Sequence, residues 1–343
     1  MADAHGIQHL ISLQDLGDAR LSDLIERSIA VKASGARGGL TGRAAGMLFF
    51  RGSLRTRTSF EAAVHQLGGH SINLNAASDF WELEARRGVV MDGRAPEHIE
   101  DAAQVLSRYL DLLAIRPALA GQSWETDRRD EGIRAWAAHA RVPVINMESA
   151  LWHPLQALAD VMTLQEALGT LAGRRLAITW THSPTPASSS VVHSLMVTAV
   201  RLGMHVSVAH PPGYDLDGEV LAGARALAEA SSASIRTSAD DAGLDQEAAV
   251  RGAHVVYARS WPSMEDYGNP TLAASRRART GEWIVDEKLL ALGDDARVMH
   301  AGPVRRNLEA TDEVLDGPRS LVYEQAENRM HSQKALLLEF LGG

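Results

Sequence analysis

The chain contains the stretch Phe49-Phe50-Arg51-Gly52-Ser53-Leu54-Arg55-Thr56-Arg57-Thr58-Ser59-Phe60, an apolar strand that breaks into a turn and then opens a helix. Such a turn points free backbone N–H groups and the positive end of the helix dipole at one spot. Hydroxyl and guanidinium donors, which hold phosphate oxygens well, gather at the same spot from Ser53, Arg55, Thr56 and Arg57. The stretch predicts an anion cradle, although a solvated basic helix start would explain it if it stood alone.

Short apolar runs rich in β-branched residues alternate with stretches of helical periodicity on both sides of this segment, which is typical of a doubly wound α/β sheet. The strands expected in the first half are Met47–Phe50, Ser71–Leu74, Leu112–Ile115 and Val142–Ile145. Those expected in the second half are Leu176–Trp180, His205–Ala209, Val255–Ala258 and Val298–His300. Helices are expected at Ser59–Leu67, His98–Tyr109 and Gln325–Leu341.

With 343 residues, the chain has room for two domains that each bury a core. We expect one domain to comprise residues 1–153 together with a last helix at 325–343, and the other to comprise 154–324. The 34 Lys and Arg against 43 Asp and Glu give a net charge of −9 with no basic tail, which argues against a nucleic-acid partner.

Several classes of protein are disfavoured by what the sequence lacks. It contains no apolar run of about 18 residues, and the opening MADAHGIQHL does not resemble a signal peptide. We therefore expect a cytoplasmic protein without membrane contact. It has no cysteine, so it has no thiolate nucleophile and no thiolate metal site.

Polar residues follow four other expected strands, at the carboxyl ends where ligands of open α/β sheets bind. Any one of them is more often a satisfied surface group. They are Arg116, the group His153-Pro154-Leu155-Gln156, Arg259, and the group His300-Ala301-Gly302-Pro303 with Arg305.

Together these motifs resemble the aspartate/ornithine carbamoyltransferase family over essentially the whole chain. The ordered signatures are Ser-x-Arg-Thr-Arg at Ser53–Arg57, His-Pro-x-Gln at His153–Gln156 and His-x-x-Pro from His300. Within that family the sequence is most similar to the N-acetylornithine and N-succinylornithine carbamoyltransferases, through Phe80-Trp81, Gly88–Gly93, Val142–Glu148, Thr179–Pro186 and Glu327–Arg329.

The resemblance implies two doubly wound parallel-sheet domains of the carbamoyltransferase type, with a knot near Thr179–Pro186 in the second. It also implies a homotrimer whose sites lie at subunit interfaces, because Trp81 is similar to a residue that a neighbouring subunit inserts into the site. The substrates would be carbamoyl phosphate and a small amino acid, and the reaction would need no cofactor or metal.

The resemblance also assigns residues to carbamoyl phosphate. The phosphate would be held by Ser53, Leu54, Arg55, Thr56 and Arg57. Arg116 would reach both the phosphate and the carbonyl, Trp81 would also contact carbamoyl phosphate, and Arg329 would close the site. The carbamoyl end would contact His153, Gln156 and the backbone at Ala301 and Gly302. The expected catalytic set is Arg55, Arg116, His153, Gln156 and His300.

For the amine substrate, the resemblance implies contacts with Glu148, Arg259, Arg305, Pro96, Trp81 and His182, in which the two arginines pair with the α-carboxylate. Pro96 occupies a position that is Glu in acetylornithine enzymes and Pro in succinylornithine enzymes, which favours N-succinylornithine. Ser183 and Thr185 stand where relatives carry His and a basic residue, so a cation for the succinyl carboxylate is missing there. Ala301-Gly302 stands where ornithine and acylornithine carbamoyltransferases usually have Cys-Leu.

Three functions are compatible with this pattern. The first is carbamoyl transfer to the δ-amine of an N-acylated ornithine in arginine biosynthesis. The second keeps carbamoyl phosphate but uses ornithine or another amine in specialised metabolism. The third is a catalytically silent binding or regulatory trimer that retained the fold.

Overall fold

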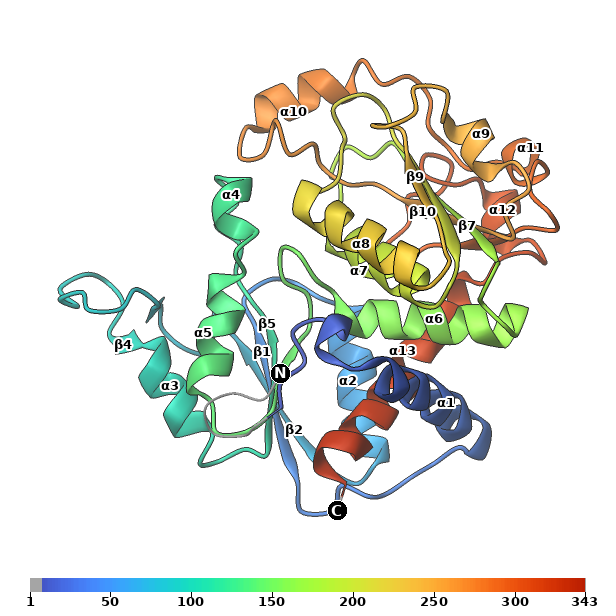
Figure 1. Ribbon diagram of the computed structural model, residues 1–343. Helices are drawn as coiled ribbons and strands as arrows, with labels where there is room; N and C mark the ends of the chain where they lie inside the picture. Colours follow the sequence, from blue (N-terminus) through green and yellow to red (C-terminus); the bar gives the residue numbers. More distant parts are fainter. Residues whose placement is uncertain (1–7, 343) are drawn as a thin grey trace. The chain divides into compact units, whose positions relative to one another are not determined.

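The computed structural model describes residues 8–342, which form two compact units (Figure 1). Within the described residues, unit 1 comprises 8–120, 127–162 and 327–342, and unit 2 comprises 121–126 and 163–326. The chain passes between the units inside α6 (Pro154–Leu168) and α13 (Val322–Leu341), so each of these helices has turns in both.

Unit 1 is built on a parallel sheet with the strand order β2-β1-β5-β6. Its strands are β1 (Ala44–Phe49), β2 (His70–Asn75), β5 (Leu112–Arg116) and β6 (Val144–Asn146). Helices α3 (Ile99–Leu106) and α5 (Glu131–His139) cover one face, and α1 (Asp18–Ser34), α2 (Arg55–Gln66) and the unit 1 part of α13 cover the other (Figure 1). The first described turn is a 3-10 helix at Leu13–Asp15.

A small separate sheet is formed by β3 (Leu83–Glu84) and β4 (Glu97–His98), which pair in parallel and flank the segment that carries Pro96.

Unit 2 has a five-stranded parallel sheet with the order β11-β10-β7-β8-β9. Its strands are β7 (Arg175–Trp180), β8 (His205–Ala209), β9 (Ile235–Thr237), β10 (Val255–Arg259) and β11 (Arg297–Met299). Its helices are α4 (Trp124–Asp127, which ends at the unit boundary), α7 (Ser190–Arg201), α8 (Gly218–Ala230), α9 (Gln246–Val250), α10 (Pro270–Arg277), α11 (Glu287–Leu290) and α12 (Asp312–Asp316).

The two parallel sheets confirm the α/β fold expected from the sequence. Every residue of β10, and all of β7 except Arg175, is buried, because helices cover both faces of a parallel sheet and leave no polar side. All eight expected strands are present, and their ends lie within two residues of the predicted ones, except that β1 begins three residues earlier. Among the strands of residues 8–342, the sequence missed the short β3, β4 and β9.

Two helix starts were placed too late. The helix expected from Gln325 is α13, which begins at Val322, and the helix expected from Ser59 is α2, which begins at Arg55. The first turn of α2 is Arg-Thr-Arg, and only Thr56 in it is buried, so the apolar periodicity that marked the helix begins a turn too late.

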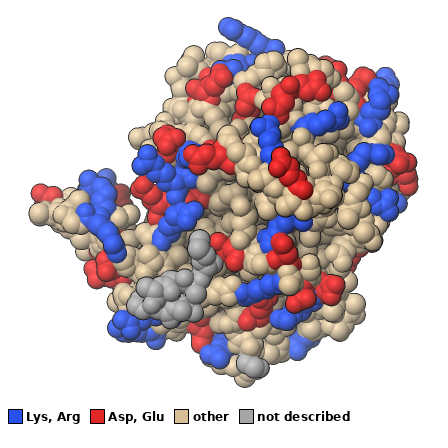
Figure 2. Space-filling view, in the orientation of Figure 1, with Lys and Arg blue, Asp and Glu red and all other residues tan. Residues whose placement is uncertain are grey.

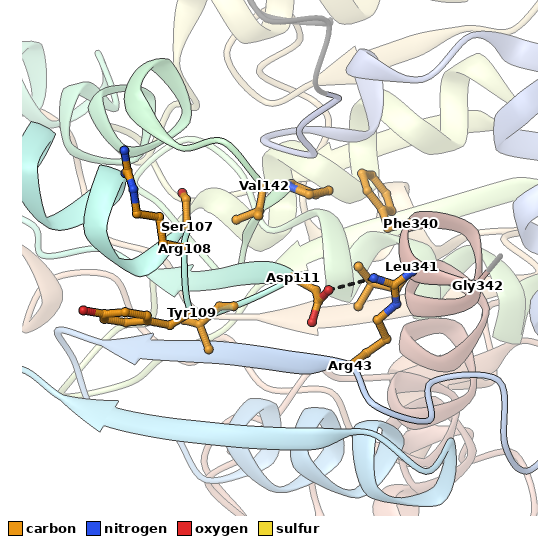
Figure 3. A pocket seen from close by; sticks show the side chains of 11 residues that line it. Arg43, Ser107, Arg108, Tyr109, Asp111, Val142, Phe340, Leu341 and Gly342 are labelled. Atoms are coloured by element: carbon orange, nitrogen blue, oxygen red, sulfur yellow. Dashed lines mark hydrogen bonds and ion pairs between the residues drawn. The ribbon is translucent and has the colours of Figure 1, made fainter.

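The amino edge of the unit 1 sheet carries a cavity of about 560 Å³ (Figure 3). Arg43 and Asp111, the residues just before β1 and β5, form an ion pair of 2.8 Å in it, and the end of α13 closes one side. This cavity lies at the opposite sheet edge from the predicted anion cradle and contains none of the predicted site residues, so it is not the candidate active site.

Charges of both signs are interspersed on the face drawn in Figure 2. No helix within residues 8–342 is long and apolar enough to span a membrane.

Candidate active site

The carboxyl edge of the unit 1 sheet brings the first two predicted segments together. Phe49, the last residue of β1, lies in register with Arg116, the last residue of β5. The backbone N–H of Phe50 then donates to the carbonyl of Arg116 at 3.0 Å. The turn that leads into α2 therefore starts beside Arg116, although the two are more than 60 residues apart in the sequence.

The first turn of α2 is well suited to an anion. Its N-cap residue, Leu54, makes no side-chain cap, and the turn contains no acidic residue. The guanidinium carbon of Arg57 lies 4.2 Å from the centroid of the Phe49 ring, a cation–π contact that orients this side chain at the end of β1. The uncapped N–H groups and positive helix end are therefore joined by cationic side chains, as an anion cradle requires.

Arg329, on α13, is buried at the same place. One of its terminal nitrogens donates to Thr56 Oγ1 at 2.8 Å and the other to Gln156 Oε1 at 2.5 Å. Gln156 in turn donates to Asp160 Oδ1 at 2.7 Å. These bonds tie three helices, α2, α6 and α13, around one guanidinium.

Burial lowers the pKa of Arg329 to about 10, while Asp160 and Glu148 act to raise it and the positive charges of Arg116 and Arg55 act to lower it. The side chain remains cationic at neutral pH. Because these charges affect each other, the guanidinium groups of Arg55, Arg116 and Arg329 share one electrostatic environment in unit 1. Arg116 is paired with Glu148, so part of this charge is offset, but the cluster keeps a net positive charge and suits an anionic ligand.

Glu148 forms an ion pair with Arg116, and the two side chains are only 7% and 15% exposed. Glu148 has a φ of 139°, a backbone conformation that side-chain-bearing residues rarely adopt. Arg51 helps to hold it, because this guanidinium donates to the carbonyls of Glu148 (2.6 Å) and Pro117 (3.0 Å). Glu148, expected at the amine substrate, thus belongs to the same cluster as Arg116.

His153 is 4% exposed and directly precedes α6, and its carbonyl accepts the backbone N–H groups of Gln156 and Ala157. The loop before it is held by Asp130, which accepts from Ser149 Oγ at 2.6 Å and from the backbone N–H of Ala150 at 3.0 Å. Burial raises the pKa of Asp130, although these two donors oppose the shift.

In unit 2, a second group of predicted residues lies at the ends of β10 and β11. Arg259 is 5% exposed and donates to the carbonyl of Gly302 at 3.1 Å. The backbone N–H of Gly302 donates to His300 Nδ1 at 2.8 Å, so the other ring nitrogen, Nε2, carries the hydrogen. That nitrogen faces the carboxylate of Glu309 at 3.4 Å. The turn after β11 is thereby fixed to both Arg259 and Glu309.

Arg305 is directed to the Pro-rich loop after β7, where it donates to the hydroxyls of Ser183 (3.1 Å, from Nε) and Thr185. In the same loop, His182 Nδ1 lies 3.4 Å from Thr280 Oγ1, and the His182 ring packs edge-on against the Trp180 ring. Arg305 and His182 were both predicted to bind the amine substrate. In the structure their side chains have different hydrogen-bond partners in unit 2.

Trp81 and Pro96 lie on the segment around β3 and β4, and both are exposed, Trp81 by 57%. The Trp81 indole donates to Glu97 at 2.7 Å and lines a cavity of about 520 Å³ with Phe50 and Pro117, which follow β1 and β5. This segment therefore lies at the carboxyl edge of the unit 1 sheet, but Trp81 makes no hydrogen bond there to the cluster of arginines in the described chain.

The sequence motifs did not point to several residues that hold the site. Asp160 could have been found, since it is an acidic residue four positions after Gln156 in an otherwise apolar stretch of helix. Asp130 left no such signal, because it meets Ser149 and Ala150 only through the fold.

Two family models match the chain. The carbamoyl-P binding domain of aspartate/ornithine carbamoyltransferase matches residues 8–166, and the Asp/Orn binding domain matches residues 180–340. Parallel α/β units with a cluster of arginines at the carboxyl edge of one sheet accord with a transferase that uses a phosphorylated donor. The chain belongs to the aspartate/ornithine carbamoyltransferase family, and it is a carbamoyltransferase.

Individual relatives match along nearly the whole chain. An N-acetylornithine carbamoyltransferase of Xanthomonas campestris pv. campestris is 38% identical over 339 residues, which cover 98% of each protein. An ornithine carbamoyltransferase of a Synechocystis species is 36% identical over 334 residues, 97% of this chain and 96% of that protein.

Solved structures agree with this. The crystal structure of acetylornithine transcarbamylase with acetylcitrulline is 37% identical, covers 98% of this chain and 100% of its own, and has a TM-score of 0.94. A glutamate-to-proline mutant of N-acetyl-L-ornithine transcarbamylase, complexed with carbamyl phosphate and N-succinyl-L-norvaline, has a TM-score of 0.93 at 37% identity, and covers 97% of this chain and 100% of its own.

Proposed function

We propose that the protein transfers the carbamoyl group of carbamoyl phosphate to the δ-amine of an N-acylated ornithine, with N-succinylornithine favoured over N-acetylornithine. The observation that carries this proposal is the meeting, at the carboxyl edge of the unit 1 sheet, of the first turn of α2 with Arg116, which lies in register with Phe49 at the end of β1, and with Arg329, which donates to Thr56 in that turn. In this proposal unit 1 binds carbamoyl phosphate and unit 2 binds the amino substrate, the division that the names of the two family models describe.

Unit 1 would bind the donor substrate through its arginines. The first turn of α2, with Ser53 and Arg57, holds the phosphate, and Arg329 neutralises charge from the other side. Arg55, Arg116 and His153 polarise the carbonyl and stabilise the oxyanion that forms on it. These groups are tied to helices and strands, so they would need little rearrangement as charge develops.

The reaction forms an N–C bond from the amine to the carbamoyl carbon and breaks the bond from that carbon to the phosphate oxygen. Inorganic phosphate leaves with its electron pair. An alkyl amine has a pKa of about 10.4, so it must reach the site uncharged or lose a proton there. The leaving phosphate is the proposed final acceptor of the amine proton, and orientation of the two reactants can supply roughly 7–11 kcal/mol of the rate enhancement.

The acceptor is assigned from Pro96 and from the relatives. The Xanthomonas relatives at 38% identity carry N-acetylornithine in their names, which supports an N-acylated ornithine. The glutamate-to-proline mutant of the acetylornithine enzyme was crystallised with a succinylated ligand. The resemblance puts Pro96 of this chain at the position that differs between the two types. The proline and the succinylated ligand together support N-succinylornithine.

We also propose that the protein is a cytoplasmic homotrimer of arginine biosynthesis in which Trp81 enters the site of a neighbouring subunit. The exposure of Trp81 supports this, since a large aromatic side chain that is 57% exposed on a projecting segment is typical of an interface.

A different amine acceptor remains the second candidate. Ala301-Gly302 and the buried Glu309 change the turn at which the attacking amine would lie, and this change favours an acceptor that differs from ornithine.

A colorimetric assay of ureido products tests the proposal, with carbamoyl phosphate and N-succinylornithine, N-acetylornithine, ornithine and a panel of other amines. We expect product with N-succinylornithine first and N-acetylornithine second. A preference for an unrelated amine would establish the second candidate, and no turnover with any amine would contradict the proposed activity.

A further inference from the structure

Two neighbouring arginines after β11 differ sharply in their surroundings. The charge of Arg306 is neutralised by two carboxylates, because its guanidinium forms ion pairs of 2.6 Å with both Asp312 and Asp316. Arg305, which is also exposed, has only neutral partners for its guanidinium among residues 8–342, the hydroxyls of Ser183 and Thr185. A cation held in place by neutral groups keeps its charge available for a ligand.

The hydrogen bonds leave a particular part of Arg305 open. Nε and Nη2 share one edge of a planar guanidinium, and this is the edge that the two hydroxyls occupy. The second edge, formed by Nη1 and Nη2, can still donate two parallel hydrogen bonds, the geometry that a carboxylate accepts. Ser183 is only 1% exposed, so one of the two anchors is itself fixed in the protein.

Arg259 offers a separate cation in the same unit. It is buried beside the Gly302 carbonyl, and its Nε has no hydrogen-bond partner in the described part of the chain. Unit 2 thus presents two guanidinium groups with different anchors. N-acetylornithine carries one carboxylate, whereas N-succinylornithine carries two.

We propose that Arg305, anchored by Ser183 and Thr185, recognises the terminal carboxylate of a dicarboxylic acyl group on the acceptor, while Arg259 binds the α-carboxylate. This inference rests on the proposed function and deepens it. It also corrects the expectation that the Pro-rich loop lacks a cation, because Ser183 and Thr185 replace basic residues of relatives but receive a guanidinium from another segment. Arg305 is then a specificity-determining residue and the two hydroxyls are positioning residues.

The test compares KM and kcat for N-succinylornithine and N-acetylornithine in the wild type and in Arg305→Gln. Arg305→Gln removes a hydrogen bond between charged groups only for the substrate with a second carboxylate. We therefore expect this variant to raise the KM for N-succinylornithine about tenfold to a hundredfold more than the KM for N-acetylornithine. The Arg305→Lys variant keeps the charge and should recover part of this difference. The matched control is Arg306→Gln, for which the ratio of the two KM values should stay within about twofold of wild type.

Thr185→Val and Ser183→Ala test the two anchors. Each should raise the KM for N-succinylornithine relative to that for N-acetylornithine, but by less than Arg305→Gln does. Combined with Arg305→Gln, either variant should change this ratio of KM values little further. An equal loss for both substrates in Arg305→Gln would assign Arg305 to the α-carboxylate and overturn the inference. Absence of turnover with either substrate in the wild type would instead contradict the proposed function, so the two failures are distinguishable.

Discussion

At the scale of single residues, the turn after β11 shows how a substituted motif can remain ordered. His300 accepts from the Gly302 N–H and presents its other nitrogen to Glu309, while the Glu309 carboxylate also accepts the backbone N–H of Arg305 at 2.8 Å. Glu309 thus links His300 to the segment that carries Arg305. The sequence identified His300 and Arg305 from the motif, but nothing in their spacing indicated that Glu309 is buried between them.

We predict that Glu309→Gln lowers the free energy of unfolding at pH 7 by about 1–3 kcal/mol, because hydrogen bonds to a buried charged group are replaced by neutral ones. Burial would raise the pKa of Glu309, but its contacts with His300, the Arg305 N–H and Ser260 lower it below the ordinary 4.5. A depressed carboxyl pKa contributes stability above pH 4.5 that is lost as the pH falls through the folded-state value.

Urea unfolding at several pH values checks this. The difference between wild type and Glu309→Gln should shrink below pH 4.5, whereas the Glu313→Gln control, at a residue with no such buried contacts, should show little difference at any pH. A constant difference across the range would mean that the Glu309 charge is not what stabilises the turn.

At the scale of elements, parallel strands with both faces buried were predictable because their apolar runs are nearly continuous. β9 was not, since Ile235–Thr237 has only one fully buried residue. The motifs of the candidate site were predictable because they directly follow these strands in the sequence. The loop between β6 and α6 was less so, because its geometry depends on Asp130, which follows β5 in the chain and meets the loop only in the folded unit.

We predict that Asp130→Ala costs about 2 kcal/mol of stability, since it removes the acceptor of the buried Ala150 N–H and of Ser149. The same variant should lower kcat, because the loop carries Glu148 and leads to His153. Urea unfolding and the carbamoyl-transfer assay measure the two effects. Asp130→Asn, which keeps one acceptor, should lose less of each.

The exposed neighbour Glu131→Gln serves as the matched control and should change stability by less than about 0.5 kcal/mol. Full activity in Asp130→Ala, at temperatures where it is folded, would show that this loop does not need its anchor for catalysis.

At the scale of the whole molecule, the proposed trimer makes Trp81 and the arginine cluster partners from different subunits. We predict that Trp81→Ala and Arg116→Gln each reduce activity strongly as separate preparations. Subunits of the two variants, denatured and refolded together, should regain part of the wild-type activity, because some mixed sites then combine an intact Trp81 with an intact Arg116.

Size-exclusion chromatography with light scattering establishes the oligomeric state of each preparation, and each variant refolded alone is the control. If the mixture is no more active than the average of its parts, although trimers form, Trp81 acts within its own subunit or has no part in the site.

The most direct measurement is calorimetric titration of the wild-type protein with fresh carbamoyl phosphate, repeated on Arg55→Gln and on Arg116→Gln. The arginine cluster of unit 1 predicts saturable binding to the wild type, weakened at least about tenfold in both variants. Binding should be unchanged in Arg108→Gln, an arginine at the opposite edge of the sheet. Equal affinity in all four proteins, or no binding to any, would contradict the account.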